Sequence, residues 1–265
     1  MKSAFPASAP TARTRHCALT LKRVSAGLLL AANLVFPPGL APAAAAVKYV
    51  THNIAAGQYP MGVAVDPGTH NVYVPNELSN TVTVINGSSI IATIPVGQYP
   101  VGVAVDPTTH TVYVANLTTA DDPAVNGSVS IISGTSVTAT VTVGSGPRGI
   151  AVDPTTHTVY VTNLSNNGLP YSNSVSVING NTITASIPMN YPMPWAVAVD
   201  PTTHTVFATV SGTSLGSFIE VINGTSVTAD VPAGNYPVAV AVDPTPHKVY
   251  VANVYDANLT EFKGR

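Results

Sequence analysis

The sequence has few charged side chains and almost no cysteine. Charged residues make up 8% of its 265 residues, against about 25% in typical soluble domains. The single cysteine is Cys17, so no disulfide can form within the chain, and a small disulfide-stabilised scaffold is excluded. Folding must therefore rest on apolar packing and hydrogen bonds, with Thr, Ser and Asn supplying most of the polar surface.

The first 46 residues differ from the rest in composition. They hold five basic side chains and no acidic one, and they continue with an apolar run of 13 residues at 24–36 and the small-residue stretch APAAAA. This order is typical of a secretory signal peptide, and the apolar run is shorter than the roughly 20 residues that a membrane-spanning helix needs. We predict a signal peptide over residues 1–46, a mature domain over 47–265 without a membrane span, and a secreted, periplasmic or cell-surface location.

The remaining chain is acidic. Residues 47–265 contain five basic side chains against twelve acidic ones, a formal net charge of −7. Domains that bind nucleic acids usually gather Lys and Arg to neutralise phosphates. We therefore expect no nucleic-acid partner.

One sequence pattern occurs five times. Each copy has an apolar run, an Asp-Pro step, a His four residues after the Asp, and a run rich in Val and Tyr, as in AVDPTTHTVYV at 151–161. Successive Asp residues are 40, 47, 47 and 43 residues apart. Two further β-rich runs follow, split by a turn such as Asn86-Gly87. Four short runs with turn residues between them predict a four-stranded antiparallel sheet in each copy.

Repeats of about 40 to 45 residues with four strands each indicate a β-propeller. We expect an all-β ring of about five blades, complete or part of a longer propeller. Residues 48–57 align with 88–97, the fourth strand of the first full repeat, whereas the last repeat has only a weak third strand. We therefore predict that this N-terminal strand completes the last blade and closes the ring, which hides two exposed sheet edges.

The repeated stretch VAVDPTTHTVYVAN, followed by TVTVING and ATIPVG, resembles the YVTN-type β-propeller repeat. The similarity covers residues 47–256 and occurs in all five copies. Similar proteins are exported bacterial or archaeal propellers, including surface-layer and YncE-like periplasmic ones. The resemblance implies a binding or surface role without a cofactor.

The repeated Asp and His residues are the first candidates for chemistry. They are Asp66 and His70, Asp106 and His110, Asp153 and His157, Asp200 and His204, and Asp243 and His247. A catalytic base with an orienting carboxylate is one interpretation, but a catalytic site is a single asymmetric arrangement and this pair occurs in every repeat. Stacked sheets also lie about 10 Å apart, too far for equivalent His residues to share a metal ion. We predict that these residues stabilise the turn between the first and second strands, and that they bind no metal.

Sequence variation is concentrated at one end of the predicted ring. The loops between second and third strands differ widely, from NELSN at 76–80 to NLTTADDPAVNG at 116–127, and the crossovers into each first strand emerge at the same end. Variable loops on a rigid scaffold usually bind ligands. The crossover residues that we expect around the channel mouth include Arg148, Trp195, Tyr59, Tyr99 and Tyr236.

An aromatic rim with one cation suits a sugar, a peptide or a carboxylate. The alternative is that Trp195 only fills space between blades and that Arg148 is solvated. Both interpretations place these two residues near the channel.

Two functions are open at this point. The first is an exported, non-enzymatic scaffold that binds an unknown cell-surface, carbohydrate or protein ligand as a monomer and without a cofactor. The second is a metal-dependent lactonase-type hydrolase, which needs acidic side chains around a cation at the channel. Asp121 and Asp122 are the best candidates for such a site, and no first strand carries a glutamate. We favour the binding scaffold.

Overall fold

The computed structural model describes residues 51–118, 125–164, 173–213 and 216–263, which belong to one compact unit, Thr51–Arg265. The predicted signal peptide and its cleavage site lie outside these residues. In the described ranges nearly all regular structure is β-strand, with one short 3-10 turn, η1 (Glu77–Ser79). No helix in those ranges is long and apolar enough to cross a membrane.

The strands form five antiparallel sheets in chain order, called blades 1 to 5 here. Blade 1 contains β1 (Ala64–Val65), β2 (Asn71–Asn76), β3 (Thr81–Asn86) and β4 (Ser89–Pro95). Blade 2 contains β5 (Pro100–Asp106), β6 (Thr111–Asn116), β7 (Asn126–Ser133) and β8 (Ser136–Ser145). Blade 3 contains β9 (Pro147–Asp153), β10 (Thr158–Asn163), β11 (Ser174–Asn179) and β12 (Thr182–Pro188). Blade 4 contains β13 (Pro194–Asp200), β14 (Thr205–Thr213), β15 (Gly216–Asn223) and β16 (Ser226–Pro232). Blade 5 contains β17 (Pro237–Asp243), β18 (Lys248–Asn253) and β19 (Asn258–Lys263).

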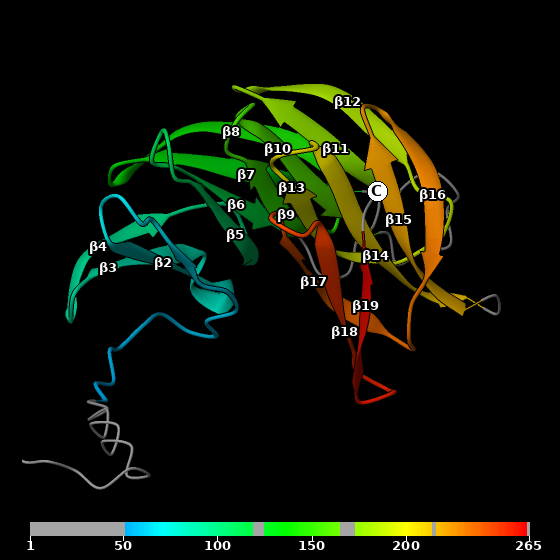
Figure 1. Cartoon of the computed structure of the whole chain (residues 1–265). Coiled ribbons are helices and arrows are strands. Elements are labelled where there is room, and N and C mark those ends of the chain that lie inside the picture. Colours follow the sequence, from blue (N-terminus) through cyan, green and yellow to red (C-terminus); the bar gives the residue numbers. More distant parts are fainter. Residues whose placement is uncertain (1–50, 119–124, 165–172, 214–215, 264–265) are drawn as a thin grey trace, which may run out of the picture. The chain divides into compact units, whose positions relative to one another are not determined.

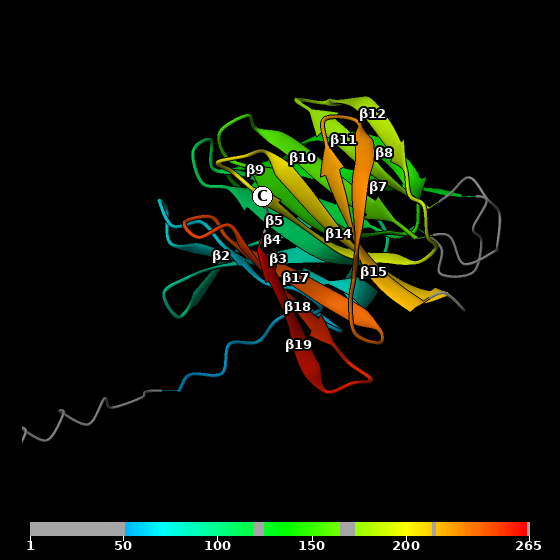
Figure 2. The same cartoon turned by 45° about the vertical axis from the view of Figure 1, so that its right-hand side comes forward.

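The blades follow one another around a common centre (Figures 1 and 2). Figure 1 shows β5, β9, β13 and β17 towards the centre and β8, β12 and β16 towards the outside. The innermost strands of neighbouring blades pack against each other. This confirms the predicted propeller of four-stranded antiparallel blades, one of which has three strands in the described residues.

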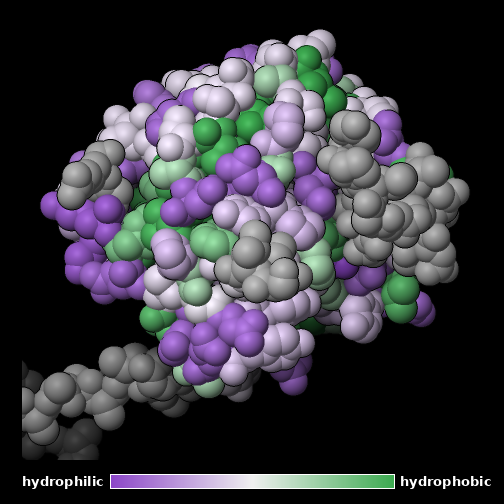
Figure 3. Space-filling view, turned by 90° about the vertical axis from the view of Figure 1, so that its right-hand side faces the viewer, coloured by the Kyte–Doolittle hydropathy of each residue, from purple (hydrophilic) through white to green (hydrophobic). Residues whose placement is uncertain are grey.

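The hydrophobic core lies between the blades. Tyr73 and Val84 of blade 1, for example, pack in one cluster with Val112 and Ile132 of blade 2, and three similar clusters lie between the following pairs of blades. Strands that are apolar on both faces require such packing on both sides. On the face shown in Figure 3, hydrophilic and hydrophobic residues alternate in small groups, in keeping with the low charge content.

The Asp-Pro-x-x-His turns join neighbouring blades. The Nδ1 atom of the His lies 2.7 to 3.0 Å from a carboxylate oxygen of the Asp in the preceding blade. These inter-blade clasps are His110–Asp66, His157–Asp106, His204–Asp153 and His247–Asp200. The five His residues of these turns have φ angles of 54–60°, a left-handed conformation in which His is enriched. The repeated His thus ends its own turn and also holds the preceding blade.

Asp106 shows the electrostatics of a clasp. One of its carboxylate oxygens accepts from His157, and the other accepts from the side chain and the backbone N–H of Thr108 at 2.6 and 2.9 Å. Burial by itself raises the pKa of Asp106, but the hydrogen bonds from Thr108 and His157 outweigh burial and hold the pKa at about 2, below the ordinary 3.8. The buried carboxylate is therefore ionised and fully engaged.

A second repeated contact fixes the end of the second strand in blades 1, 2, 3 and 5. Asn163 is buried, and its side-chain nitrogen donates to the hydroxyls of Ser174 and Ser176 at 3.0 and 2.9 Å. Gly144, at the end of the preceding blade, lies so close that an added Cβ would be 2.6 Å from the Asn163 side chain. The same Asn–Gly contact recurs at Asn76 with Gly57, Asn116 with Gly97, and Asn253 with Gly234. Glycine is thus needed at each of these positions because the Asn side chain occupies the space of a Cβ.

Blade 4 departs from this pattern. Val210 stands where the other blades have the Asn, and Glu220 of β15 replaces the small hydroxyl residue. The Glu220 side chain is fully buried and accepts the backbone N–H groups of Asn190 and Tyr191 at 3.0 and 2.8 Å. Burial raises the pKa of Glu220 to about 7, although these two hydrogen bonds favour the ionised form. In blade 4, the Glu220 carboxyl group therefore takes the place of the uncharged Asn–Gly contact that the other blades make.

The described residues do not show the predicted N-terminal strand that completes the last blade. Residues 51–57 form no strand, and within the described ranges blade 5 has only β17, β18 and β19. The Gly57 N–H donates to Asn76 at 3.0 Å and the Gln58 N–H to Ser79 at 2.7 Å, so this segment is held beside blade 1. The Gly57 contact with Asn76 is the one that the ends of β4, β8 and β16 make with the following blade, but among the described residues β19 pairs only with β18.

We predict that Asp106→Asn lowers the free energy of unfolding by about 2 kcal/mol at pH 7, because it removes the charge that the clasp stabilises. The pKa of Asp106 is lower when folded, so this contribution is present above pH of about 4 and is lost as the pH falls towards 2. Urea unfolding of dilute protein between pH 7 and 2 tests this. Asp243→Asn is the matched control, since Asp243 sits in the same turn but makes no clasp within the described chain. Equal losses in the two variants would contradict the prediction.

We also predict that Glu220→Gln removes a pH dependence. The folded state binds a proton on Glu220 more tightly than the unfolded state does, so wild-type stability falls as the pH rises from about 4.5 to 7, by an amount on the order of 3 kcal/mol. Gln stays neutral, and the variant should be equally stable at pH 5 and pH 8 in chemical denaturation. Glu261→Gln, on the exposed β19, should keep the wild-type slope. A Glu220→Gln protein with an unchanged slope would show that Glu220 is not the group involved.

Candidate binding site at the channel mouth

The crossovers into the first strands have an unusual backbone. The residue before each strand-initial proline has a positive φ, between 51° and 60°, at Tyr59, Tyr99, Gly146, Met193 and Tyr236. Such a conformation is unfavourable for bulky residues, by about 1 to 3 kcal/mol. The carbonyl oxygen of each of these residues accepts a backbone N–H from the last part of the second strand of the same blade or from the segment that follows it, at 2.9 to 3.3 Å. Crossovers and variable loops are therefore tied together at one end of the blades.

Glycine lets the innermost strands converge below this rim. A Cβ on Gly102 would lie 2.2 Å from the carbonyl oxygen of Arg148, and one on Gly149 would lie 2.7 Å from that of Trp195. The Thr162 hydroxyl contacts the same Trp195 oxygen at 3.1 Å and the Gly149 nitrogen at 2.8 Å. The backbones that carry Arg148 and Trp195 are thus held rigidly against each other.

Four side chains from three blades form a continuous row at this end. The Arg148 guanidinium carbon lies 4.4 Å from the centroid of the Trp195 ring, a cation–π contact. The Trp195 ring lies 5.6 Å from Tyr236, and Tyr236 lies 4.8 Å from Tyr255. We call Arg148, Trp195, Tyr236 and Tyr255 the aromatic row. Tyr255 is exposed, and the other three are half-buried.

The row contains two unused hydrogen-bond donors. Nε of Arg148 and Nε1 of Trp195 are buried and have no partner. A buried donor without a partner costs about 1 to 3 kcal/mol. Burial lowers the pKa of Arg148. Glu77 and Tyr236 act in the opposite direction and favour the charged guanidinium. The site therefore offers a stacked cation, and beneath it lie two buried N–H groups without an acceptor.

The predicted rim residues are only partly brought together. Arg148, Trp195 and Tyr236 lie in the row, whereas Tyr59 and Tyr99 make no ring contact with it among the described residues. Sequence reasoning missed Tyr255, which comes from the turn after β18, and the influence of Glu77. Both residues lie in loops that vary between the repeats, and this position was the signal in the sequence that could have identified them.

The candidate metal ligands can be placed only in part. Asp121 and Asp122 lie outside the described residues. Within the described ranges, no group of three or more His, Cys, Asp or Glu side chains is arranged to hold a metal ion. The repeated Asp and His residues are engaged in the turns and in the inter-blade clasps.

No protein-family model matches the chain, and no curated protein sequence matches it. Several solved structures share its fold. Hydrazine synthase from Kuenenia stuttgartiensis has a TM-score of 0.63 and 21% identity, over 77% of this chain and 58% of that chain. A functionally unknown protein from Desulfotomaculum acetoxidans has a TM-score of 0.62 and 15% identity, over 79% and 71%. The WD40 β-propeller domain of Doa1 has a TM-score of 0.58 and 10% identity, over 77% and 63%.

The similarity to these structures concerns the fold alone. The chain spans 58% of the length of the hydrazine synthase chain that it matches. Together with the blades and their packing, these comparisons show that the described residues have a β-propeller architecture.

Proposed function

We propose that this chain is an exported, non-enzymatic propeller of the YVTN-repeat type that binds a carbohydrate on the aromatic row. The observation that carries the proposal is the Arg148–Trp195 stack with its two buried, unpartnered N–H donors. The export part rests on the basic, apolar and small-residue order of residues 1–46. The family part rests on the repeated VYVxN and Asp-Pro-x-x-His stretches.

The chemistry of the row favours a sugar ring. Aromatic faces stack on the apolar face of a pyranose, while ring and hydroxyl oxygens accept hydrogen bonds from Arg and Trp. Arg148 adds a positive charge that suits a uronic acid, and Glu77 contributes an opposite charge nearby. A sugar with a carboxylate on one edge and an apolar face on the other would match the positive charge of Arg148 and the aromatic faces of the row together.

Substitution in the row should remove binding without unfolding the protein. We expect Trp195→Ala and Arg148→Ala each to weaken binding of uronate-containing oligosaccharides at least tenfold, and Arg148→Lys to restore little, because an ammonium lacks the planar fork. Calorimetric titration with acidic and neutral oligosaccharides, chosen from an immobilised panel, measures this. Tyr99→Ala is the matched control, since Tyr99 sits in an equivalent crossover outside the row. Full binding by Trp195→Ala, or no oligosaccharide bound by wild type, would argue against this site.

The leader makes a separate prediction. Expressed in a bacterial host, the wild-type chain should appear outside the cytoplasm with its N-terminus near Val47, as read by intact mass and N-terminal sequencing. Leu29→Arg interrupts the apolar run and should leave an uncleaved cytoplasmic precursor. An uncleaved wild-type chain would refute the assignment, whatever the binding assay shows.

A further inference from the structure

The dipeptide Asn-Gly recurs along the chain, and its side-chain amide can react with the backbone. Within the described residues these pairs begin at Asn86, Asn126, Asn179 and Asn223, and another, Asn167-Gly168, lies outside them. The backbone nitrogen of the Gly can attack Cγ of the preceding Asn, because glycine has no Cβ that hinders the approach. None of these residues belongs to the aromatic row.

Three of the described pairs occupy the same place in their blades, the tight turn between the third and fourth strands. Asn86, Asn179 and Asn223 end β3, β11 and β15, and the Gly that follows each of them has a φ of 58–62°. All three Asn residues are exposed, and a Cβ added to any of the three glycines would meet nothing within 4 Å. The backbone therefore gives the three turns the same reactivity, and side-chain contacts distinguish them.

The Asn86 side chain is held by two hydrogen bonds to the neighbouring strand and turn. Its Nδ2 atom donates to the carbonyl oxygen of Thr69 at 3.1 Å and to Oδ1 of Asn71 at 2.8 Å. Asn71 begins β2 and pairs with Asn86 across the sheet. Both bonds must break before Cγ of Asn86 can turn towards the nitrogen of Gly87.

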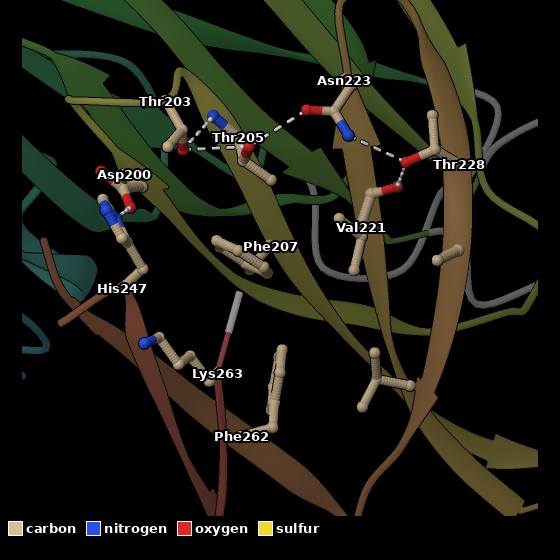
Figure 4. Close-up of a pocket in the computed structure, with 12 residues that line it drawn as sticks. Asp200, Thr203, Thr205, Phe207, Val221, Asn223, Thr228, His247, Phe262 and Lys263 are labelled. Atoms are coloured by element: carbon tan, nitrogen blue, oxygen red, sulfur yellow. Dashed lines mark hydrogen bonds and ion pairs between the residues drawn. The ribbon is translucent and has the colours of Figure 1, made fainter. Parts of the chain in front are cut away.

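The Asn223 side chain is held from both sides (Figure 4). The Thr205 hydroxyl donates to its Oδ1 atom at 3.1 Å, and its Nδ2 atom donates to the Thr228 hydroxyl at 3.0 Å. That hydroxyl in turn donates to the carbonyl oxygen of Val221 at 3.1 Å. The Asn223 amide is thus part of a hydrogen-bond chain across β14, β15 and β16.

The Asn179 side chain has no such restraint. It makes no hydrogen bond to any described residue. Thr158 pairs with Asn179 across the sheet, as Asn71 does with Asn86, but its hydroxyl contacts Thr156 at 3.0 Å and makes no bond to Asn179. The nitrogen of Gly180 is also without a hydrogen bond to the described residues, so both reacting groups of this turn are free.

The fourth described pair is restrained by packing. Asn126 begins β7, and Gly127 is buried. A Cβ on Gly127 would lie 2.2 Å from the Pro147 ring and 2.8 Å from the carbonyl oxygen of Asn116. The peptide between Asn126 and Gly127 therefore cannot reorient for attack without local opening of blade 2.

We propose that Asn179 is a site of spontaneous deamidation, and that in the folded protein it reacts faster than Asn86, Asn126 and Asn223. The Gly180 nitrogen gives up its proton to water and bonds to Cγ of Asn179. The Cγ–Nδ2 bond then breaks, ammonia leaves, and a succinimide ring remains. Water opens this ring at either carbonyl, which leaves aspartate or isoaspartate at position 179. The reaction needs no reactant besides water, and the inference is independent of carbohydrate binding.

The product changes the outer hairpin of blade 3 in two ways. Either product adds a carboxylate to a domain, residues 47–265, that already has a formal net charge of −7. Isoaspartate also adds one methylene to the main chain, beside the pairing of Asn179 with Thr182 that closes the hairpin of β11 and β12. We therefore expect this hairpin end to open more easily after the reaction, far from the inner strands that carry Arg148 and Trp195.

Peptide mapping of the incubated full chain measures each site separately. Cleavage after aromatic residues places every Asn-Gly pair in its own fragment, because Tyr113, Tyr160, Tyr171 and Phe218 lie between them. At mildly alkaline pH, mass spectrometry should show the Asn179 fragment converting to acid at least about fivefold faster than the fragments with Asn86, Asn126 and Asn223, because local opening there breaks no side-chain hydrogen bond. In urea the four sites should react at similar rates.

Two reciprocal substitutions test whether the side-chain restraint is the cause. Asn71→Thr gives blade 1 the residue that blade 3 has, and it should speed the reaction at Asn86 without changing the rate at Asn179. Thr158→Asn gives blade 3 the residue of blade 1, and it should slow the reaction at Asn179 alone. Urea unfolding of each variant checks that the fold is kept.

Three results would overturn the proposal. The first is an unreacted Asn179 in the folded chain after the other sites have converted, and the second is equal rates at Asn86, Asn179 and Asn223. The third is a rate difference that persists unchanged in urea, because the difference would then come from the local sequence and not from the fold.

Discussion

Packing of one blade against the next is the interaction on which the rest of this structure depends. Each sheet is apolar on both faces, so no blade can bury its surface alone, and every blade needs a neighbour on each side. The repeated polar residues serve the same need. The inter-blade clasps and the Asn–Gly contacts fix how far each blade is turned and shifted against the preceding one. Sequence repetition follows because the same interface must form several times.

The rigidity of these interfaces is what places the aromatic row. Arg148 and Trp195 stand at the same position in successive blades, directly after the crossover proline, and Tyr236 stands directly before the proline of the next crossover. The close approach at Gly149 brings Arg148 and Trp195 together. A strained crossover backbone is tolerated there because its carbonyl oxygens are bound by the loops. The unpartnered donors of the row are thus held in place before any ligand arrives, which lowers the ordering cost of binding.

Much of the fold could be predicted from sequence, because its signals are local. Asp-Pro steps, Asn-Gly turns and alternating Val-rich runs each define a strand or turn within a few residues. The clasp partners could not be predicted in this way, since His157 and Asp106 are 51 residues apart and meet only through the stacking of blades. The row was half predicted: the crossovers indicated Trp195 and Arg148, but Tyr255 lies in a loop after β18. Ring closure depends on the angle between blades, which no local pattern encodes.

The uncovered ends follow from the same constraint that builds the interior. An interface made from complementary halves leaves one half free at each end of an open row of blades, and here the free halves keep their polar parts, His70 and Asp243, as well as their apolar parts. Apolar side chains such as Val65 and Leu259 are exposed at these ends, while the free strand β19 also exposes Glu261 and Lys263, charges of the kind that protect sheet edges. In the rest of the chain each such face is covered by a neighbouring blade. The interior of the protein therefore already specifies the chemistry of whatever covers its ends.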